Sequence, residues 1–236
     1  MAKQKKSYVP TDEPSKPDYA RYAPPVPITE NHKRYHKLLK DKSKKIVVCT
    51  GWAGVGKSCT SAYYASQALL DKTVDGIVLV RSLEGVGKNP GAYPGTDFEK
   101  NEPKLRQILK YISSFTNTDT FSLLGNRQVI ICGLYDIQGM DFTNKYILVT
   151  EAQTLTKEEM YILLTRGGYK IVLEGDTLAA GQCTNHKVKH GEDGLSFLFD
   201  KLKGLPFVGS IRMDNTEDIV RDDYIKEIII RMSQEI

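Results

Sequence analysis

Gly51-Trp52-Ala53-Gly54-Val55-Gly56-Lys57-Ser58 is the stretch of sequence that decides the fold. It fits the pattern G-x-x-x-x-G-K-[ST], which is typical of phosphate-binding loops. An apolar run at residues 45–50 precedes it, and residues 58–70 follow with small and aliphatic side chains at helical spacing. A strand, a glycine-rich turn and a helix in this order form the setting that the pattern requires. We therefore predict that this turn binds a nucleotide.

The residue types in this turn suit phosphate chemistry. Glycines let the backbone curl, so that successive N–H groups and the start of the following helix point at phosphate oxygens. Lys57 is expected to reach the β and γ phosphates, and the Ser58 hydroxyl is expected to ligate Mg²⁺. We predict that the whole segment from Gly51 through Cys59 contacts the nucleotide.

A second apolar strand of such a fold should end in a carboxylate that handles the metal or the attacking water. The candidate is Tyr146-Ile147-Leu148-Val149-Thr150-Glu151-Ala152-Gln153. Thr150 stands where an Asp would hold the Mg²⁺ shell, so Glu151 is the predicted general base and metal contact. The following strand ends in Glu174-Gly175-Asp176, which places further acids at the carboxyl edge of the sheet, where ligands gather.

Short apolar runs alternate with amphipathic helical patterns along the rest of the chain. We predict strands at 45–50, 76–81, 128–132, 146–150, 169–174 and 206–211, and helices at 32–42, 58–70, 103–115, 156–166, 193–203 and 216–234. Pro103 is expected in the first turn of its helix, after a long glycine-rich loop at 82–102. The alternation predicts an α/β fold in three layers, with a mostly parallel sheet covered on both faces.

The composition excludes several classes of protein. The 236 residues are 40% hydrophobic and 26% charged, which suits one large globular domain or two small ones and neither a disordered nor a fibrous chain. No run approaches the roughly 18 apolar residues of a membrane span, so we expect no membrane insertion. The four cysteines stand singly, without the spacing of a zinc or disulfide framework, and we expect a cytoplasmic protein.

The charge is divided unevenly along the chain. Residues 1–45 hold 12 basic and 5 acidic residues, a net charge of +7, whereas the remainder holds 21 basic and 24 acidic residues, a net charge of −3. Six of the ten prolines precede residue 30. We predict a flexible, basic, proline-rich arm at 1–28 and a single domain at 29–236. The arm fits either a solvated leader or a contact with nucleic-acid phosphates or a neighbouring subunit.

The phosphate loop and the Glu151 segment are accompanied by further motifs along the chain. Together the motifs occur in the same order as in the PhoH-like ATPases, which residues 29–231 therefore resemble. Glu151-Ala152-Gln153 resembles the D-E-A-Q motif of that family, and Gly175-Asp176 resembles its G-D. The other matching stretches are Arg81 with Tyr93-Pro94-Gly95-Thr96, Phe98-Glu99-Lys100, Pro103, Leu164-Thr165-Arg166-Gly167, Gly194-Leu195 and Asp218-Ile219-Val220-Arg221. The nucleotide-binding core of the family is similar to that of superfamily 1 helicases.

The resemblance implies a RecA-like P-loop ATPase that binds ATP with Mg²⁺ and is coupled to single-stranded nucleic acid, RNA more than DNA. It implies that Arg166 and Arg221 pair with the γ phosphate, because a guanidinium suits the charge of the transferred group. Asp176 joins the catalytic set, and Tyr35 and Gln153 are the further cofactor contacts. A single core lacks the second lobe of a monomeric helicase, so we expect a homo-oligomeric ring, with a hexamer as the first guess.

Ordinary structural roles stay open for several of these residues. Arg221 also fits an ion pair with Asp218 or Glu217 on a helix, and Arg166 also fits a cation at a helix C-terminus. Tyr35 fits either packing in the core or stacking on a base.

The chain departs from the family pattern mainly at site positions. Thr150 replaces an Asp, Trp52 a Pro, Ala179 a Gln and Gln138 an Arg, and His32 lies where an adenine-reading Gln is expected. We expect these departures to affect the rate of ATP turnover more than the fold. They motivate a second hypothesis, a regulatory module that holds nucleotide and barely hydrolyses it. A small-molecule kinase is the third hypothesis, and the lack of an Arg-rich lid argues against it.

Overall fold

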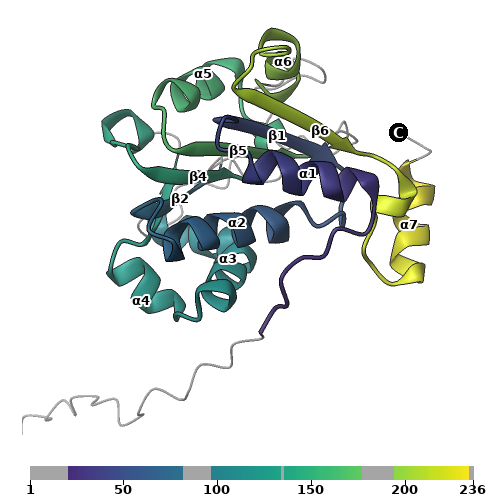
Figure 1. Ribbon diagram of the computed structural model, residues 1–236, viewed down its shortest axis with the longest axis horizontal. Helices are drawn as coiled ribbons and strands as arrows, with labels where there is room; N and C mark the ends of the chain where they lie inside the picture. Colours follow the sequence, from purple (N-terminus) through teal and green to yellow (C-terminus); the bar gives the residue numbers. More distant parts are fainter. Residues whose placement is uncertain (1–20, 82–96, 134–135, 177–193, 234–236) are drawn as a thin grey trace, which may run out of the picture.

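The computed structural model describes residues 21–81, 97–133, 136–176 and 194–233, which form helices packed around a twisted sheet (Figure 1). Several features singled out in the sequence lie outside these ranges. They are the first 20 residues of the basic arm, the part of the glycine-rich loop at 82–96, and the segment 177–193, which contains Ala179.

Six parallel strands form the sheet in the order β3-β2-β4-β5-β1-β6. Their bounds are β1 Ile46–Gly51, β2 Gly76–Arg81, β3 Val129–Gly133, β4 Lys145–Val149, β5 Lys170–Gly175 and β6 Val208–Met213. Each lies within two residues of its predicted position. Every pairing among the described strands is parallel, so the α/β prediction is confirmed and the sheet is more regular than the expected mostly parallel one.

Alternate residues of each strand enter two separate cores, one on each face of the sheet. In β1, Val47 and Cys49 belong to one core, and Val48 between them belongs to the other. In β4, Leu148 and Val149 divide in the same way. This burial on both faces explains why the strands read as continuous apolar runs and not as alternating patterns.

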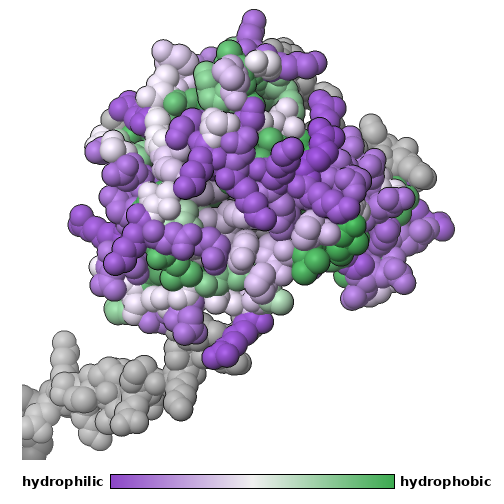
Figure 2. Space-filling view, in the orientation of Figure 1, coloured by the Kyte–Doolittle hydropathy of each residue, from purple (hydrophilic) through white to green (hydrophobic). Residues whose placement is uncertain are grey.

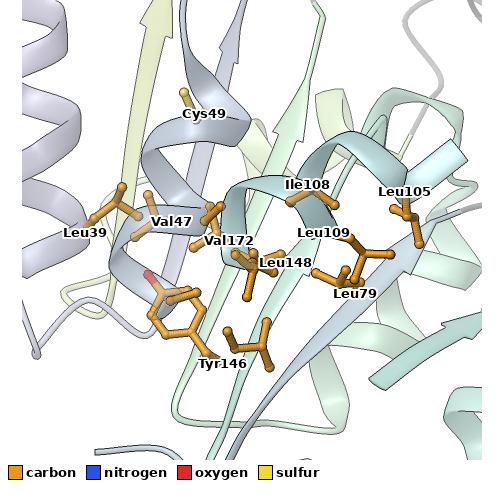
Figure 3. Packing of buried hydrophobic residues seen from close by; sticks show 14 of the residues in the cluster. Leu39, Val47, Cys49, Leu79, Leu105, Ile108, Leu109, Tyr146, Leu148 and Val172 are labelled. Atoms are coloured by element: carbon orange, nitrogen blue, oxygen red, sulfur yellow. The ribbon is translucent and has the colours of Figure 1, made fainter. Parts of the chain in front are cut away.

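Helices cover both faces of the sheet and complete the three layers (Figure 1). Their bounds are α1 Glu30–Lys40, α2 Lys57–Leu70, α3 Asp97–Thr116, α4 Thr120–Gly125, α5 Lys157–Thr165, α6 Gly194–Lys201 and α7 Asp223–Ser233. Side chains of α1 to α4 pack into one core, whereas those of α5 and α6 pack into the other. Figure 3 shows Leu105, Ile108 and Leu109 of α3 beside Leu79 and Leu148 of the sheet. Within the described ranges, no helix is long and apolar enough to span a membrane.

Two helix starts differ from the prediction. Helix α3 begins at Asp97, so Pro103 lies inside it and not in its first turn. Within a helix a proline removes one backbone hydrogen bond and its ring crowds the carbonyl of the preceding turn, which is why a first-turn position is the usual expectation. Helix α7 begins at Asp223 and not at residue 216. Thr216–Asp218 form a short 3-10 helix, and the backbone after it makes hydrogen bonds outside any helix. The Val220 N–H, for example, donates to the Gly54 carbonyl of the phosphate loop, 3.0 Å away.

Polar contacts fix both ends of α1. At its start, the Thr29 hydroxyl and the His32 ring form a reciprocal capping box. Asp218, which is fully buried, accepts hydrogen bonds there from Thr29 Oγ1 at 2.5 Å and from Asn31 Nδ2 at 2.8 Å. At the other end, the buried Lys170 ammonium donates to the carbonyls of residues 38, 39 and 41. These contacts hold α1 against β5 and the segment that leads to Arg221.

Candidate nucleotide site

A cavity of about 120 Å³ opens at the carboxyl edge of the sheet, where β1, β4 and β5 end. It is lined by Ala53, Lys57, Ser58, Thr150, Glu151, Glu174, Gly175 and Asp176. The fold therefore gathers in one place the predicted phosphate loop, the predicted general base and the acids at the end of β5. Strand β5 lies between β1 and β4, so its acids face both of the other groups.

The loop between β1 and α2 has the backbone that phosphate binding requires. Gly54 and Gly56 have φ angles of 82° and 80°, in the left-handed region that glycine adopts without steric cost. Gly56 is the N-cap of α2, and no side chain caps that end. The N–H groups of the first turn of α2 are thus available to an anion, where the helix dipole also favours negative charge.

Lys57 lies across this loop. Its ammonium donates to the Gly51 carbonyl at 2.7 Å and to the Trp52 carbonyl at 2.8 Å. The side chain is therefore folded back over the cavity that the loop borders, within reach of any anion held by the loop N–H groups.

Glu174 is the carboxylate in contact with the loop serine. The Ser58 hydroxyl donates to Glu174 Oε2 at 2.6 Å, and Glu174 is only 2% exposed. Burial raises the pKa of Glu174, and the hydrogen bond from Ser58 and the charge of Lys57 oppose that rise. The sequence placed Glu174 at this edge but did not reveal its contact with Ser58.

Tyr35 is not placed to stack on a base, so this part of the prediction is wrong. The side chain is 1% exposed and belongs to the core beneath α1. Its hydroxyl donates to Glu174 Oε1 at 3.3 Å. Tyr35 thus supports Glu174 from below the site and cannot contact a nucleotide with its ring.

Glu151 is held in an unusual backbone conformation beside the cavity. Its φ of 55° and ψ of 40° place it in the left-handed region, which a residue with a side chain rarely adopts. Such strain concentrates at functional sites. The side chain accepts a hydrogen bond from Gln153 Nε2 at 2.7 Å, and Gln153 Oε1 accepts one from the Asp176 N–H at 3.2 Å. Gln153 therefore links the ends of β4 and β5 and orients Glu151.

The two predicted arginines occupy different places. Arg221 lies over the phosphate loop of its own chain, since a Cβ built on Gly54 would lie 2.7 Å from its Cγ. It lies outside α7, so the alternative of a helix-surface ion pair does not apply. Arg166 is the exposed C-cap of α5 and does not line the cavity. Neither arginine lines the cavity itself, but Arg221 lies beside the phosphate loop.

The other loop residues divide between the site and the core. Ala53 lines the cavity, whereas Val55 is buried in the core at 1% exposure. Trp52 is half-buried against that core, which suits packing more than base stacking. Cys59 lies on the first turn of α2, and burial raises the pKa of its thiol.

The cavity suits a Mg²⁺ ion whose ligands come partly from the protein and partly from the phosphates of a bound nucleotide. Among the described residues, no three His, Cys, Asp or Glu side chains converge to hold a metal by themselves. Mg²⁺ usually takes one or two carboxylates, several waters and the phosphates of its nucleotide. The Ser58 hydroxyl and the Glu174 carboxylate supply oxygens of that kind at the loop. His32 and His36 do not form a metal pair, because one caps α1 and the other contacts Tyr64.

Comparison with known proteins agrees with this geometry. The family model described as "PhoH-like protein" matches residues 26–233. The chain is 26% identical over 204 residues to a PhoH-like protein of Synechocystis sp., covering 85% of this chain and 60% of that protein. It is 29% identical over 200 residues to Protein PhoH of Escherichia coli, covering 82% and 54%.

A PhoH-like protein of Mycobacterium tuberculosis is 30% identical over 207 residues, covering 86% of this chain and 56% of that protein. The chain spans little more than half the length of these curated relatives. The family match nevertheless takes in every strand and helix described above. The chain belongs to the PhoH-like protein family, a family of P-loop ATPases.

Proposed function

We propose that this chain is an ATPase that hydrolyses ATP with Mg²⁺ at the cavity between β1, β4 and β5. The observation that carries the proposal is the convergence of Lys57, Ser58, Glu151 and Glu174 on one cavity. In-line phosphoryl transfer needs phosphate binding, charge neutralisation and an oriented water. The cavity offers a group for each of these tasks.

The residues divide these tasks as follows. The loop N–H groups and Lys57 bind and orient the phosphates. Glu151, held by Gln153, accepts a proton from the attacking water. Arg221 neutralises charge at the phosphates from above Gly54. The Ser58 hydroxyl and the carboxylates beside it would hold Mg²⁺, which would supply positive charge against the phosphates.

Phosphate release from Mg²⁺-ATP by the full chain tests the proposal. We expect release that saturates with ATP and is absent without the divalent cation. ATP that binds and stays intact would instead favour the regulatory module, a hypothesis that Thr150 still motivates. If the chain does not bind ATP at all, both hypotheses fail.

We further propose that the activity is coupled to single-stranded nucleic acid, RNA more than DNA. A groove of about 610 Å³ between α1 and α2 supports this, because it combines cations with aromatic rings. Lys33, Lys37 and Lys40 line it from α1, and Tyr63 and Tyr64 line it from α2. Hydrophilic side chains cover this face of the molecule across α1 (Figure 2). Basic grooves with rings are typical of single-strand binding surfaces.

The double substitution Lys37→Glu/Lys40→Glu tests this groove. Each phosphate contact with single-stranded nucleic acid contributes about 0.7 to the slope of log affinity against log salt. We therefore expect weaker binding of a single-stranded RNA oligonucleotide and a slope smaller by about 1.4, measured by fluorescence anisotropy at several salt concentrations.

Lys201→Glu/Lys203→Glu is the matched control, because it makes the same charge change at the end of α6 on the opposite face of the sheet. Equal loss of binding in the two double variants would show that only overall charge matters. No RNA binding by the native chain at low salt would remove the nucleic-acid proposal.

We also propose that the chain assembles into a ring, with a hexamer as the first guess. Arg166 motivates this, because it is exposed at the end of α5 and outside the cavity of its own chain, so that its guanidinium is presented to a neighbouring copy. Light scattering with Mg²⁺-ATP at micromolar protein should give a mass several times the 26.5 kDa of one chain. A monomer under all nucleotide conditions would contradict the assembly.

A further inference from the structure

We propose that Glu174 supplies the carboxylate of the Mg²⁺ shell that β4 lacks at Thr150, so that the metal acid has moved to the neighbouring strand β5. This inference rests on the proposed function, since it concerns the same nucleotide site. It assigns to Glu174 the role that the sequence pattern leaves without a residue.

Glu174 is in direct contact with the loop serine. Ser58 is the residue whose hydroxyl ligates Mg²⁺ in phosphate-binding loops of this pattern. Its hydroxyl lies 2.6 Å from Glu174 Oε2. A carboxylate in contact with that hydroxyl lies next to the position that the cation would occupy. Neither Glu151 nor Asp176 has such a contact with Ser58 among the described hydrogen bonds.

The register of the sheet places Glu174 and Thr150 side by side. In β4 and β5, Val149 pairs with Leu173, so continued parallel register places Thr150 beside Glu174. In β5 and β1, Glu174 pairs with Cys49, whose side chain lies in the core on the α2 side. Glu174 and Thr150 therefore point toward the face on which Ser58 begins α2. A carboxylate at position 150 or at position 174 therefore lies beside the same cavity next to Ser58.

Thr150 is a buried polar residue at the end of β4. It lines the cavity, and its side-chain hydroxyl has no hydrogen-bond partner within the described ranges. A threonine carries no negative charge for a cation, whereas the Glu174 carboxylate beside it in β5 does.

Glu151 and Glu174 have different hydrogen-bond partners. The Glu151 carboxylate accepts from Gln153, whereas the Glu174 carboxylate accepts from Ser58. Glu151 thus remains available for the attacking water, while Glu174 serves the metal. The loss of an acid at Thr150 then does not remove the metal site.

The test compares nucleotide affinity with and without the cation. Isothermal titration of a non-hydrolysable ATP analogue into the native chain should show tighter binding with Mg²⁺ than with EDTA. Glu174→Gln keeps the size of the side chain and an acceptor for Ser58, but it removes the negative charge. The Mg²⁺ effect is the ratio of the affinity for the analogue with Mg²⁺ to the affinity with EDTA. We expect this ratio to fall by about 10–100-fold in the variant, the usual result of altering the groups around a metal, while the affinity in EDTA stays unchanged.

A second variant tests whether the position of the acid, and not a disturbed fold, explains a loss of the Mg²⁺ effect in Glu174→Gln. Thr150→Asp/Glu174→Gln returns the acid to β4, and we expect it to recover most of the Mg²⁺ effect. Glu158→Gln, an exposed residue on α5, is the control for the chemical change and should behave like the native chain. Circular dichroism and melting temperature report whether each variant is folded.

The outcomes separate this inference from the proposed function. If Mg²⁺ strengthens analogue binding equally in the native chain and in folded Glu174→Gln, the inference is overturned and the ATPase proposal stands. If the Mg²⁺ effect is lost in Glu174→Gln and not recovered by adding Thr150→Asp, the relocation of the acid is wrong. If the native chain does not bind the analogue under any condition, the proposed function itself fails.

Discussion

Replacing Glu151 by Gln is expected to slow ATP hydrolysis by about 10²–10⁴-fold, the usual contribution of a general base. ATP should still bind, because Gln has nearly the same shape and the phosphate contacts come from the loop and Lys57. Gln153 can pair with the new amide as it does with the carboxylate, so the orientation at the end of β4 is retained.

Two measurements on the same protein check this expectation. Steady-state phosphate release reports turnover, and titration with a fluorescent ATP analogue reports affinity. Glu158→Gln makes the same chemical change on the exposed surface of α5 and should leave both values unchanged. If turnover falls by only a factor of about 3 in Glu151→Gln, the decrease is much smaller than removal of a general base should cause. That result would assign the proton transfer to another group.

Replacing Lys57 by Ala is expected to weaken ATP binding by about 10–100-fold, because a charged hydrogen bond contributes about 1.5–3 kcal/mol. Phosphate release should fall further, since the ammonium also neutralises charge that develops during transfer. The substitution removes the two bonds from Lys57 to the Gly51 and Trp52 carbonyls as well. Its effect therefore includes some loss of order in the loop.

Calorimetry with Mg²⁺-ATP measures the affinity, and the melting temperature reports any loss of fold. Lys42→Ala, an exposed lysine after α1, is the matched control and should bind ATP like the native chain. Native affinity in a folded Lys57→Ala chain would show that the loop does not hold the phosphates in the proposed way.

The strands could be predicted from the sequence because their residues are buried on both faces. The apolar run at 76–81 coincides with β2, and the phosphate-loop motif lies between β1 and α2 as its pattern requires. The start of α3 was missed because Pro103 resembles a first-turn proline, although the helix continues for six residues before it. The short helix α4, which Asp119 caps, carries too few residues to show a helical period.

The site was predictable only where a local motif carries it. The loop and Glu151 are local in sequence, and the structure brings them together. The contact between Ser58 and Glu174 joins residues 116 positions apart, and it depends on β5 lying next to β1. Strand order is a tertiary property, so one sequence did not reveal it. The burial of Tyr35 and the position of Arg221 over Gly54 arise from tertiary packing in the same way.

A single-turnover experiment tests the central claim most directly. The full chain is mixed in molar excess with radiolabelled ATP and Mg²⁺, and labelled phosphate is followed over time. Excess protein matters, because bound ATP then reports on this chain and not on a trace contaminant. We predict that the native chain converts the bound ATP to ADP and phosphate, while Glu151→Gln holds it intact. Bound ATP that stays unhydrolysed in the native chain, or hydrolysis that is equal in the two proteins, would contradict the account.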